Sequence, residues 1–312
     1  MISSRDIENA AQRIEPYVRK TPVIMLEQGI WQCPAQLALK LEFLQHAGSF
    51  KARGAFNRLL SQAVPEAGVV AASGGNHGIA VAYAARQLGY RAEIFVPEIS
   101  ARVKVERLRA YGASVHIQGA TYADAFLASE VHAQQTGALI VHAYDQAEVI
   151  AGQGTVGYEL QRQLPDLDTI LVAVGGGGLI AGIASSFQNA RRMPRIIGVE
   201  SEGTASMFSA LQVGHPVDVR VSGVVADALG ARRVGEIAFS IAKQFVERVV
   251  LVSDEAILRG QQSLWNDLRL VVEPSAAACV AALQTGVYQP QPDERVGIIL
   301  CGGNARFESL IA

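Results

Sequence analysis

Residues 169–178 have the sequence Thr-Ile-Leu-Val-Ala-Val-Gly-Gly-Gly-Gly, and this stretch decides the fold class. The β-branched run from Thr169 to Val174 predicts a buried strand, and the apolar run from Leu179 to Ala184 predicts the helix that follows. Four glycines between a strand and a helix leave main-chain N–H groups free to converge on an anion. Since the helix dipole adds roughly half a positive charge there, the stretch predicts a phosphate-binding loop.

The glycine loop lacks the fingerprints of nucleotide-binding loops. No lysine follows it in the pattern GxxxxGK[ST], and it does not fit GxGxxG, with Glu200 the nearest downstream acid. The chain also has no HExxH or GxSxG motif, and its six histidines lack the spacing of metal ligands. These absences disfavour zinc enzymes and serine hydrolases, and they indicate that the phosphate belongs to a phosphorylated cofactor.

The composition indicates a globular α/β protein without a nucleic-acid or membrane partner. The chain has 312 residues, of which 50% are hydrophobic and 18% are charged, and its formal net charge is -2. This length allows one large or two medium domains, and the charge offers no basic surface to nucleic acid. The uncharged segment 169–190 is long enough to cross a membrane, but the four glycines within it argue against a single helix.

The two ends of the chain and its cysteines predict where the protein works. The N-terminus, from Met1 to Glu8, is too polar for a signal peptide. Cys33, Cys279 and Cys301 have no CxxC spacing, which disfavours a disulfide framework and predicts a cytoplasmic protein. Only eight residues follow Asn304, so we expect no regulatory domain after it.

Strands and helices alternate along the chain, as in proteins whose parallel sheets are covered by helices on both faces. The predicted strands are 37–41, 68–72, 91–96, 114–117, 139–142, 169–174, 195–199 and 296–300. The predicted helices are 6–17, 52–60, 79–88, 102–111, 123–136, 179–184, 234–246, 254–267 and 275–283. We expect a large cofactor-binding domain formed by 1–67 and 146–312, into which a small substrate-clamping domain formed by 68–145 is inserted.

Lys51, in the sequence GSFKARGA at 48–55, lies at the start of a predicted helix. A cation at this position is disfavoured by up to about 1 kcal/mol, so the amine loses its proton more easily. Such an amine is suited to Schiff-base chemistry. The alternative is an exposed surface lysine without a chemical role.

Two further motifs follow predicted strands. The sequence SGGNHG at 73–78 offers N–H groups, a hydroxyl and an amide that can bind a carboxylate or a polar ring substituent. The alternative is a tight turn with Asn76 as the helix cap and His77 as a structural hydrogen-bonding residue. Cys301 begins the sequence CGGN at the carboxyl end of the last strand, where α/β folds place ligands. Its alternative is a buried cysteine that acts as a small hydrophobic residue.

These elements, in this order, resemble those of the fold-type II pyridoxal-phosphate enzymes, and more narrowly the serine/threonine dehydratase and serine racemase family. The resemblance covers nearly the whole chain and depends on the joint order of several short motifs. They are 21–23, 40–42, SFKARGA, SGGNHG, 111–113, 149–155, 175–178 and 273–276. The implied fold is the tryptophan synthase β-like α/β fold, with two open, twisted, parallel-sheet domains, the smaller inserted in the larger.

The resemblance implies a role for each motif around pyridoxal 5′-phosphate. Lys51 is the implied Schiff-base lysine, and the 5′-phosphate is implied to bind to the loop of Gly175, Gly176, Gly177 and Gly178. Phe50 would pack on the cofactor ring, Asn76 would bond its 3′-oxygen, and Cys301 would face its pyridine nitrogen. The substrate carboxylate would be held by Ser73, Gly75, Asn76 and His77.

The implied reaction is the β-elimination of L-threonine and L-serine to a 2-oxo acid plus ammonia, with the Lys51 amine as the base at Cα. A thiol opposite the pyridine nitrogen makes the ring a milder electron sink, which suits prompt elimination. The resemblance also implies a homodimer. Alternatives are a 3-hydroxyaspartate dehydratase or a serine/aspartate-type racemase on the same scaffold, and a silent cofactor-binding protein.

Three positions bear on how far the resemblance extends. Racemases of this family carry a serine as an opposite-face base where this chain has Gly74, so we expect no efficient racemisation. The family's divalent-cation site would fall on Glu200, Thr204 and Ser206. Ser206 replaces an aspartate, which weakens the predicted site for Mg²⁺ or Ca²⁺. Tyr144 and Asp145 lie where the family contacts the substrate side chain.

Overall fold

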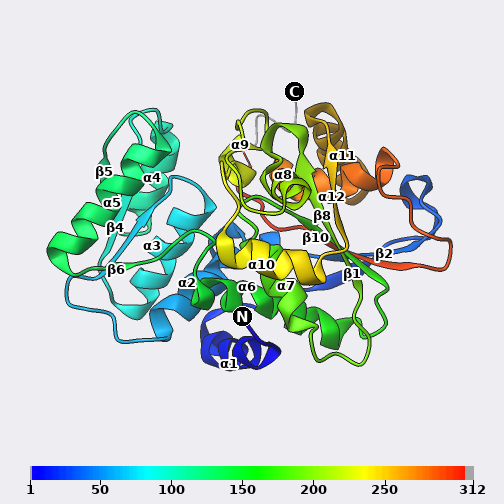
Figure 1. The fold of residues 1–312 in the computed structure, drawn as a ribbon, viewed down its shortest axis with the longest axis horizontal. Helices are drawn as coiled ribbons and strands as arrows, with labels where there is room; N and C mark the ends of the chain where they lie inside the picture. Colours follow the sequence, from blue (N-terminus) through cyan, green and yellow to red (C-terminus); the bar gives the residue numbers. More distant parts are fainter. Residues whose placement is uncertain (1, 306–312) are drawn as a thin grey trace.

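The structure, a computed structural model, describes residues 2–305 and forms two lobes that lie side by side (Figure 1). The large lobe contains a six-stranded sheet in the order β1-β2-β10-β7-β8-β9. In that order the strands are Val23–Met25, Gln36–Lys40, Arg295–Ile299, Thr169–Ala173, Arg195–Ser201 and Arg248–Val252. Neighbouring strands are parallel except at β1, which pairs antiparallel with β2.

The small lobe contains a four-stranded parallel sheet in the order β5-β4-β3-β6. Its strands are Ser114–Ile117, Ala92–Val96, Val69–Ala72 and Leu139–Ile140. All four strands come from one continuous stretch of chain, whereas the large sheet uses strands from before and after that stretch. This distribution supports the predicted division at residues 68 and 145, which we retain as a proposal.

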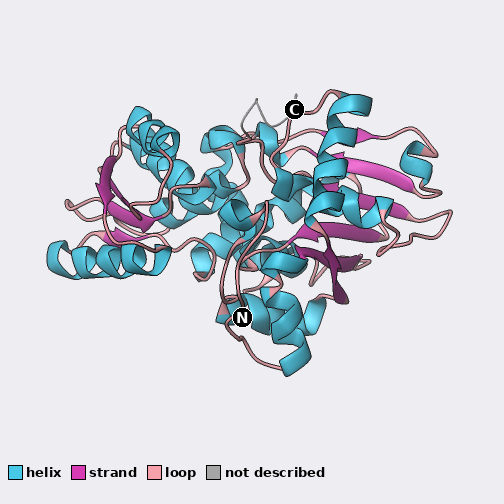
Figure 2. Ribbon diagram, turned by 90° about the horizontal axis from the view of Figure 1, so that it is seen from above, coloured by secondary structure: helices cyan, strands magenta, loops and turns pink. Residues whose placement is uncertain are grey.

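Helices cover both faces of the large sheet. Right-handed crossovers place the helices between β7 and β9 on one face, and those of the return from β9 to β10 on the other. The first group includes α7 (Gly178–Ser186), α8 (Ser206–Val213), α9 (Ala226–Leu229) and α10 (Glu236–Phe245), and α1 (Ser4–Ile14) and α6 (Ala147–Gln163) pack on α7. The second group is α11 (Asp254–Leu268) and α12 (Pro274–Gln284), of which α12 packs on four strands (Figure 2).

The small sheet is covered by α3 (Asn76–Leu88) and α4 (Arg102–Ala110), and by α5 (Tyr122–Thr136), which packs on β3, β4 and β6. A further helix, α2 (Lys51–Leu60), contacts both α3 of the small lobe and α6 of the large lobe. The start of α2 therefore lies where the two lobes meet.

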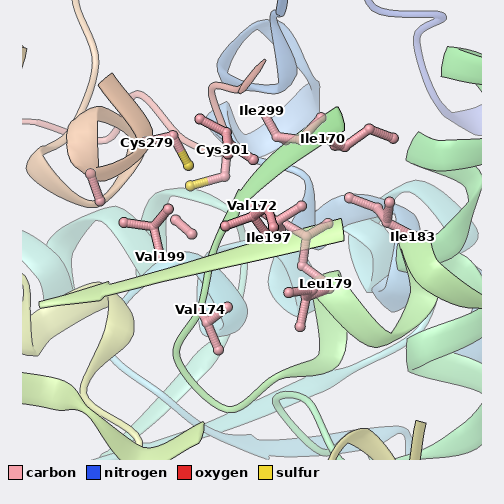
Figure 3. Close-up of a cluster of buried hydrophobic side chains, with 14 of the residues drawn as sticks. Ile170, Val172, Val174, Leu179, Ile183, Ile197, Val199, Cys279, Ile299 and Cys301 are labelled. Carbon is pink, nitrogen blue, oxygen red and sulfur yellow. The ribbon is translucent and has the colours of Figure 1, made fainter. Parts of the chain in front are cut away.

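The core of the large lobe explains the long apolar runs of the sequence. Ile170, Val172 and Ile197 of adjacent strands are fully buried, together with Ile183 of α7 (Figure 3). Strands of a parallel sheet are buried on both faces, so they have continuous rather than alternating hydrophobic residues. The uncharged segment 169–190 is accordingly divided into β7 and α7, and no helix within residues 2–305 is long and apolar enough to cross a membrane.

The predicted α/β fold is confirmed, and the strongest departure from the predicted elements is α6. Its sequence contains Gly152, Gly154 and Gly157, which are poor helix formers, and no helix is predicted there. A Cβ on Gly152 would lie 2.6 Å from the main-chain oxygen of Arg53, and one on Gly154 would lie 2.7 Å from that of Gly182. The glycines allow close contact with α2 and α7, so packing overrides local propensity. Strand β9 and helices α8 and α9 are also absent from the predicted elements.

Candidate active site

The predicted site residues lie on loops that leave the carboxyl ends of β3 and β6 in the small lobe and of β7 and β10 in the large lobe. Contacts between these loops are direct. Asn76, after β3, donates to Glu273, and the ring of Tyr144, after β6, lies against Gly176, after β7. Open parallel sheets bind ligands at this end of their strands, so the two lobes form one candidate site.

Lys51 is the first residue of α2 and is partly buried, so the exposed-lysine alternative is wrong. The preceding residue, Phe50, donates its N–H to the oxygen of Cys301 at 3.1 Å, which ties the start of the helix to β10. The Nζ of Lys51 donates to the oxygen of Ala143 at 2.6 Å. Burial lowers the pKa of Lys51 to about 8, against the opposing charge of Cys301 and Glu273. The amine is therefore easily deprotonated near neutral pH.

The four glycines form a bare main-chain loop. Gly177 has a φ of 87°, and α7 begins at Gly178. A Cβ on Gly176 would lie 2.2 Å from the ring of Tyr144, and one on Gly175 would lie 2.9 Å from Cα of Leu229. Any side chain would fill the loop, and the N–H groups of the first turn of α7 have no partner within the helix. The loop is thus suited to a phosphate.

The SGGNHG loop leads into α3, which begins at Asn76 with Gly75 as its N-cap. The predicted alternative of Asn76 as the cap is therefore wrong. The hydroxyl of Ser73 accepts the N–H of Gly75 at 3.2 Å. The Nε2 of His77 lies 2.8 Å from the oxygen of Val141, and burial lowers the pKa of His77 to about 3. His77 is therefore neutral, and its ring has a structural contact while its N–H remains at the helix start.

Cys301 is buried beside Cys279, as Figure 3 shows. Burial raises the pKa of Cys301 to about 12, with a further contribution from the charge of Glu273. The group at this position is therefore a neutral thiol. It lies close enough to Lys51 for each charge to affect the other.

A buried carboxylate, Glu273, lies at the centre of the site, and the sequence analysis assigns it no role. The Nδ2 of Asn76 donates to both of its oxygens, at 2.7 and 3.0 Å, and the hydroxyl of Ser275 donates at 2.6 Å. Burial raises the pKa of Glu273, and these hydrogen bonds oppose the rise. Apart from its place in the motif 273–276, the local signal for Glu273 is its position directly before Pro274 at the start of α12, which is too common to indicate a site.

Asp145 and Tyr144, predicted near the substrate side chain, are used partly by the fold. The carboxylate of Asp145 accepts the N–H groups of Glu236 and Ile237 at 2.9 and 3.0 Å, so it caps α10. The hydroxyl of Tyr144 donates to the oxygen of Arg233 at 3.2 Å. Together these bonds hold the loop after β6 against the large lobe.

The residues expected at a divalent-cation site do not fit a hard cation here. Glu200 is fully buried, and its oxygens accept the N–H groups of Met207 and Phe208 at 2.9 and 2.8 Å. The Ser206 hydroxyl donates to Gly175 oxygen at 3.2 Å, and Thr204 Oγ1 is buried without a partner among the described residues. Within residues 2–305 no group of three or more His, Cys, Asp or Glu side chains can hold a metal ion. The carboxylate of Glu200 serves the start of α8.

These residues do fit pyridoxal 5′-phosphate. The glycine loop provides N–H donors for a phosphate, Lys51 provides an amine whose pKa is low enough for attachment to an aldehyde, and Cys301 provides a neutral polar group. Residues 14–302 match the family described as pyridoxal-phosphate dependent enzymes. The chain belongs to this family, and the predicted resemblance is confirmed.

Individual relatives are similar over almost the whole chain. A catabolic L-threonine dehydratase of Staphylococcus aureus is 36% identical over 311 residues, which cover 97% of this chain and 89% of the relative. The structure of maize serine racemase superposes with a TM-score of 0.93 at 32% identity, covering 99% of this chain and 96% of that one. A threonine deaminase from the organism abbreviated T.th. has a TM-score of 0.91 at 35% identity, with 98% and 99% covered.

Proposed function

We propose that the protein is a pyridoxal-phosphate-dependent ammonia-lyase that converts L-threonine and L-serine to the corresponding 2-oxo acid and ammonia. Relatives named threonine dehydratase and threonine deaminase support this substrate class. The observation that carries the proposal is the pairing, in one site, of a Lys51 amine with a pKa of about 8 and a neutral Cys301 thiol.

The cofactor, bound to Lys51 through its aldehyde, supplies the electron sink that makes the substrate Cα proton acidic. Each residue of the chain then has a separate task. The N–H groups at the start of α3 hold the substrate carboxylate, and the Lys51 amine, once released, takes the Cα proton. The β-hydroxyl leaves with a proton as water. Hydrolysis of the resulting enamine consumes one water and releases ammonia and the 2-oxo acid, so the atoms balance.

The second candidate function is racemisation on the same scaffold, favoured by the similarity to maize serine racemase. A racemase needs a second base on the face opposite Lys51. The family's serine for this task is replaced by Gly74, which has no side chain to move a proton. Elimination needs only the Lys51 face, so we favour the lyase.

The proposal is tested by measuring ammonia, 2-oxo acid and the enantiomers of remaining substrate for threonine, serine and 3-hydroxyaspartate. We expect turnover of L-threonine and L-serine and none in Lys51→Ala. Turnover of hydroxyaspartate alone, or racemisation faster than ammonia release, would contradict the proposal. Cofactor absorbance that persists in Lys51→Ala would remove Lys51 from its role.

The homodimer and the cytoplasmic location belong to the same proposal. Cys33, Cys279 and Cys301 are free and buried in the structure, which suits a reducing compartment. The homodimer follows from the resemblance to the family. Sedimentation of the purified protein, with its cofactor, measures the oligomeric state directly.

A further inference from the structure

The small lobe contributes one charged side chain to the site that no motif explains. Arg107 lies on α4, and its Nη2 donates a 2.6 Å hydrogen bond to Oδ1 of Asn304. Asn304 follows β10 of the large lobe, so this bond joins the two lobes at the site. A second contact of α4 with the large lobe is the 2.8 Å ion pair between Lys104 and Asp227.

Asn304 passes the contact on to the proposed cofactor site. Its Nδ2 donates to Oδ1 of Asn76 at 2.6 Å and to the oxygen of Ala47 at 3.0 Å. Asn76 in turn donates from Nδ2 to Glu273. We call Arg107, Asn304, Asn76 and Glu273 the asparagine relay. Because each amide accepts on one side and donates on the other, the orientation of both amides is set by the charged groups at the two ends of the relay.

The charges at the two ends of the relay are opposite. Glu273 is buried and its negative charge is partly balanced by the positive charge of Arg107. Hydrogen bonds to charged groups are stronger than those between neutral groups. Other arginines of α4 do not take part: Arg102 pairs with Glu106 on the surface, and Arg109 is exposed. Arg107 is thus the end of the relay that the small lobe controls.

We propose that Arg107 is a positioning residue that holds Asn304 and, through it, fixes the Asn76 amide against the cofactor when the two lobes are closed. This inference rests on the proposed contact of Asn76 with the cofactor's 3′-oxygen. It gives the small lobe a role in cofactor binding in addition to substrate binding. It also couples lobe closure to the geometry of the site, because the relay is complete only while α4 lies against Asn304.

The first test is titration of the apoprotein with pyridoxal 5′-phosphate. Loss of one charge-assisted hydrogen bond in Arg107→Ala raises the dissociation constant about tenfold. Arg107→Lys keeps the charge and raises it less. Arg109→Ala, a matched control on the same helix, leaves it unchanged. The melting temperature of each apoprotein separates cofactor affinity from folding, since a merely structural role would lower that temperature and leave the affinity unchanged.

The second test is a double-mutant cycle with Asn304→Ala. If Arg107 acts through Asn304, Arg107→Ala has no further effect on cofactor affinity in the Asn304→Ala background. Unchanged affinity in Arg107→Ala, or an equal loss in both backgrounds, overturns the proposal; the Arg107→Lys cycle decides it if Arg107→Ala does not fold. These measurements need no substrate. A protein that binds the cofactor but does not deaminate threonine therefore fails the proposed function alone.

Discussion

The Nζ of Lys51 donates a 2.6 Å hydrogen bond to the main-chain oxygen of Ala143, which joins the start of α2 to the loop that leaves the small sheet. Burial lowers the pKa of this amine from 10.5 to about 8. The neutral fraction therefore rises tenfold for each pH unit below about 8 and then levels off. The same burial that places Lys51 in the site thus prepares it for reaction with an aldehyde.

We predict that the rate at which the apoprotein attaches pyridoxal 5′-phosphate follows this neutral fraction. The rate rises with pH up to about 8 and is flat above it, because only the unprotonated amine attacks the aldehyde. Stopped-flow measurement of cofactor absorbance gives the profile, with Lys51→Ala as the unreactive control. A rate that still rises between about pH 9 and 10 would show that Lys51 has an ordinary pKa.

The glycine loop provides a second prediction. In Gly176→Ala the new Cβ lies 2.2 Å from the ring of Tyr144, so the ring or the loop must move. We expect cofactor affinity to fall more than about tenfold, with a loss of folding stability of about 1–3 kcal/mol from overpacking. Cofactor titration and urea unfolding of the apoprotein measure the two effects. Unchanged affinity would mean that the loop does not bind the phosphate.

The sequence predicts the loops of the site better than the contacts between them. The tetraglycine, Lys51 and Cys301 are recognisable because each lies beside a strand or a helix start that local periodicity identifies. Arg107 and Glu273 act through partners 197 residues away in the chain, Asn304 and Asn76 respectively. No local pattern encodes such contacts, since they depend on how the two lobes pack. Helix α6 escapes prediction for the same reason: its glycines are favourable only against α2 and α7.

A buried ion network supports α2, and Arg53 is its centre. Arg53 donates to Glu42 and Glu159 at 2.8 and 2.7 Å, and its side chain is fully buried. We predict that Arg53→Met lowers the free energy of unfolding by about 3–5 kcal/mol, because it leaves buried carboxylates without their partner. Urea unfolding measures the loss. Arg5→Ala, which breaks an exposed pair with Glu8, is the control and leaves stability nearly unchanged. Equal effects of the two variants would contradict the prediction.

Removal of divalent cations tests the interpretation of Glu200. Since its carboxylate accepts N–H groups of Met207 and Phe208, it has no free oxygen pair for a cation. We predict that a chelator changes neither the melting temperature nor the rate of ammonia release, and that added Mg²⁺ or Ca²⁺ has no effect. Activity lost with the chelator and restored by either ion would show that the site around Glu200 binds a metal.

Gly74 decides between elimination and racemisation, and the structure leaves room to test it. A Cβ on Gly74 would lie 3.6 Å from Oγ of Ser100 and from Cγ1 of Val96, which is ordinary van der Waals contact. Gly74→Ser should therefore fold and add a hydroxyl on the face opposite Lys51. We predict that serine racemisation rises on the order of 100-fold, the effect of one positioned proton-transfer group, while ammonia release continues. Gly74→Ala fills the same space without a hydroxyl, so it should gain nothing, and chiral chromatography of the remaining substrate measures both variants. If the alanine variant racemises as fast as the serine variant, or if neither does, the missing hydroxyl at position 74 is not what separates this protein from a racemase.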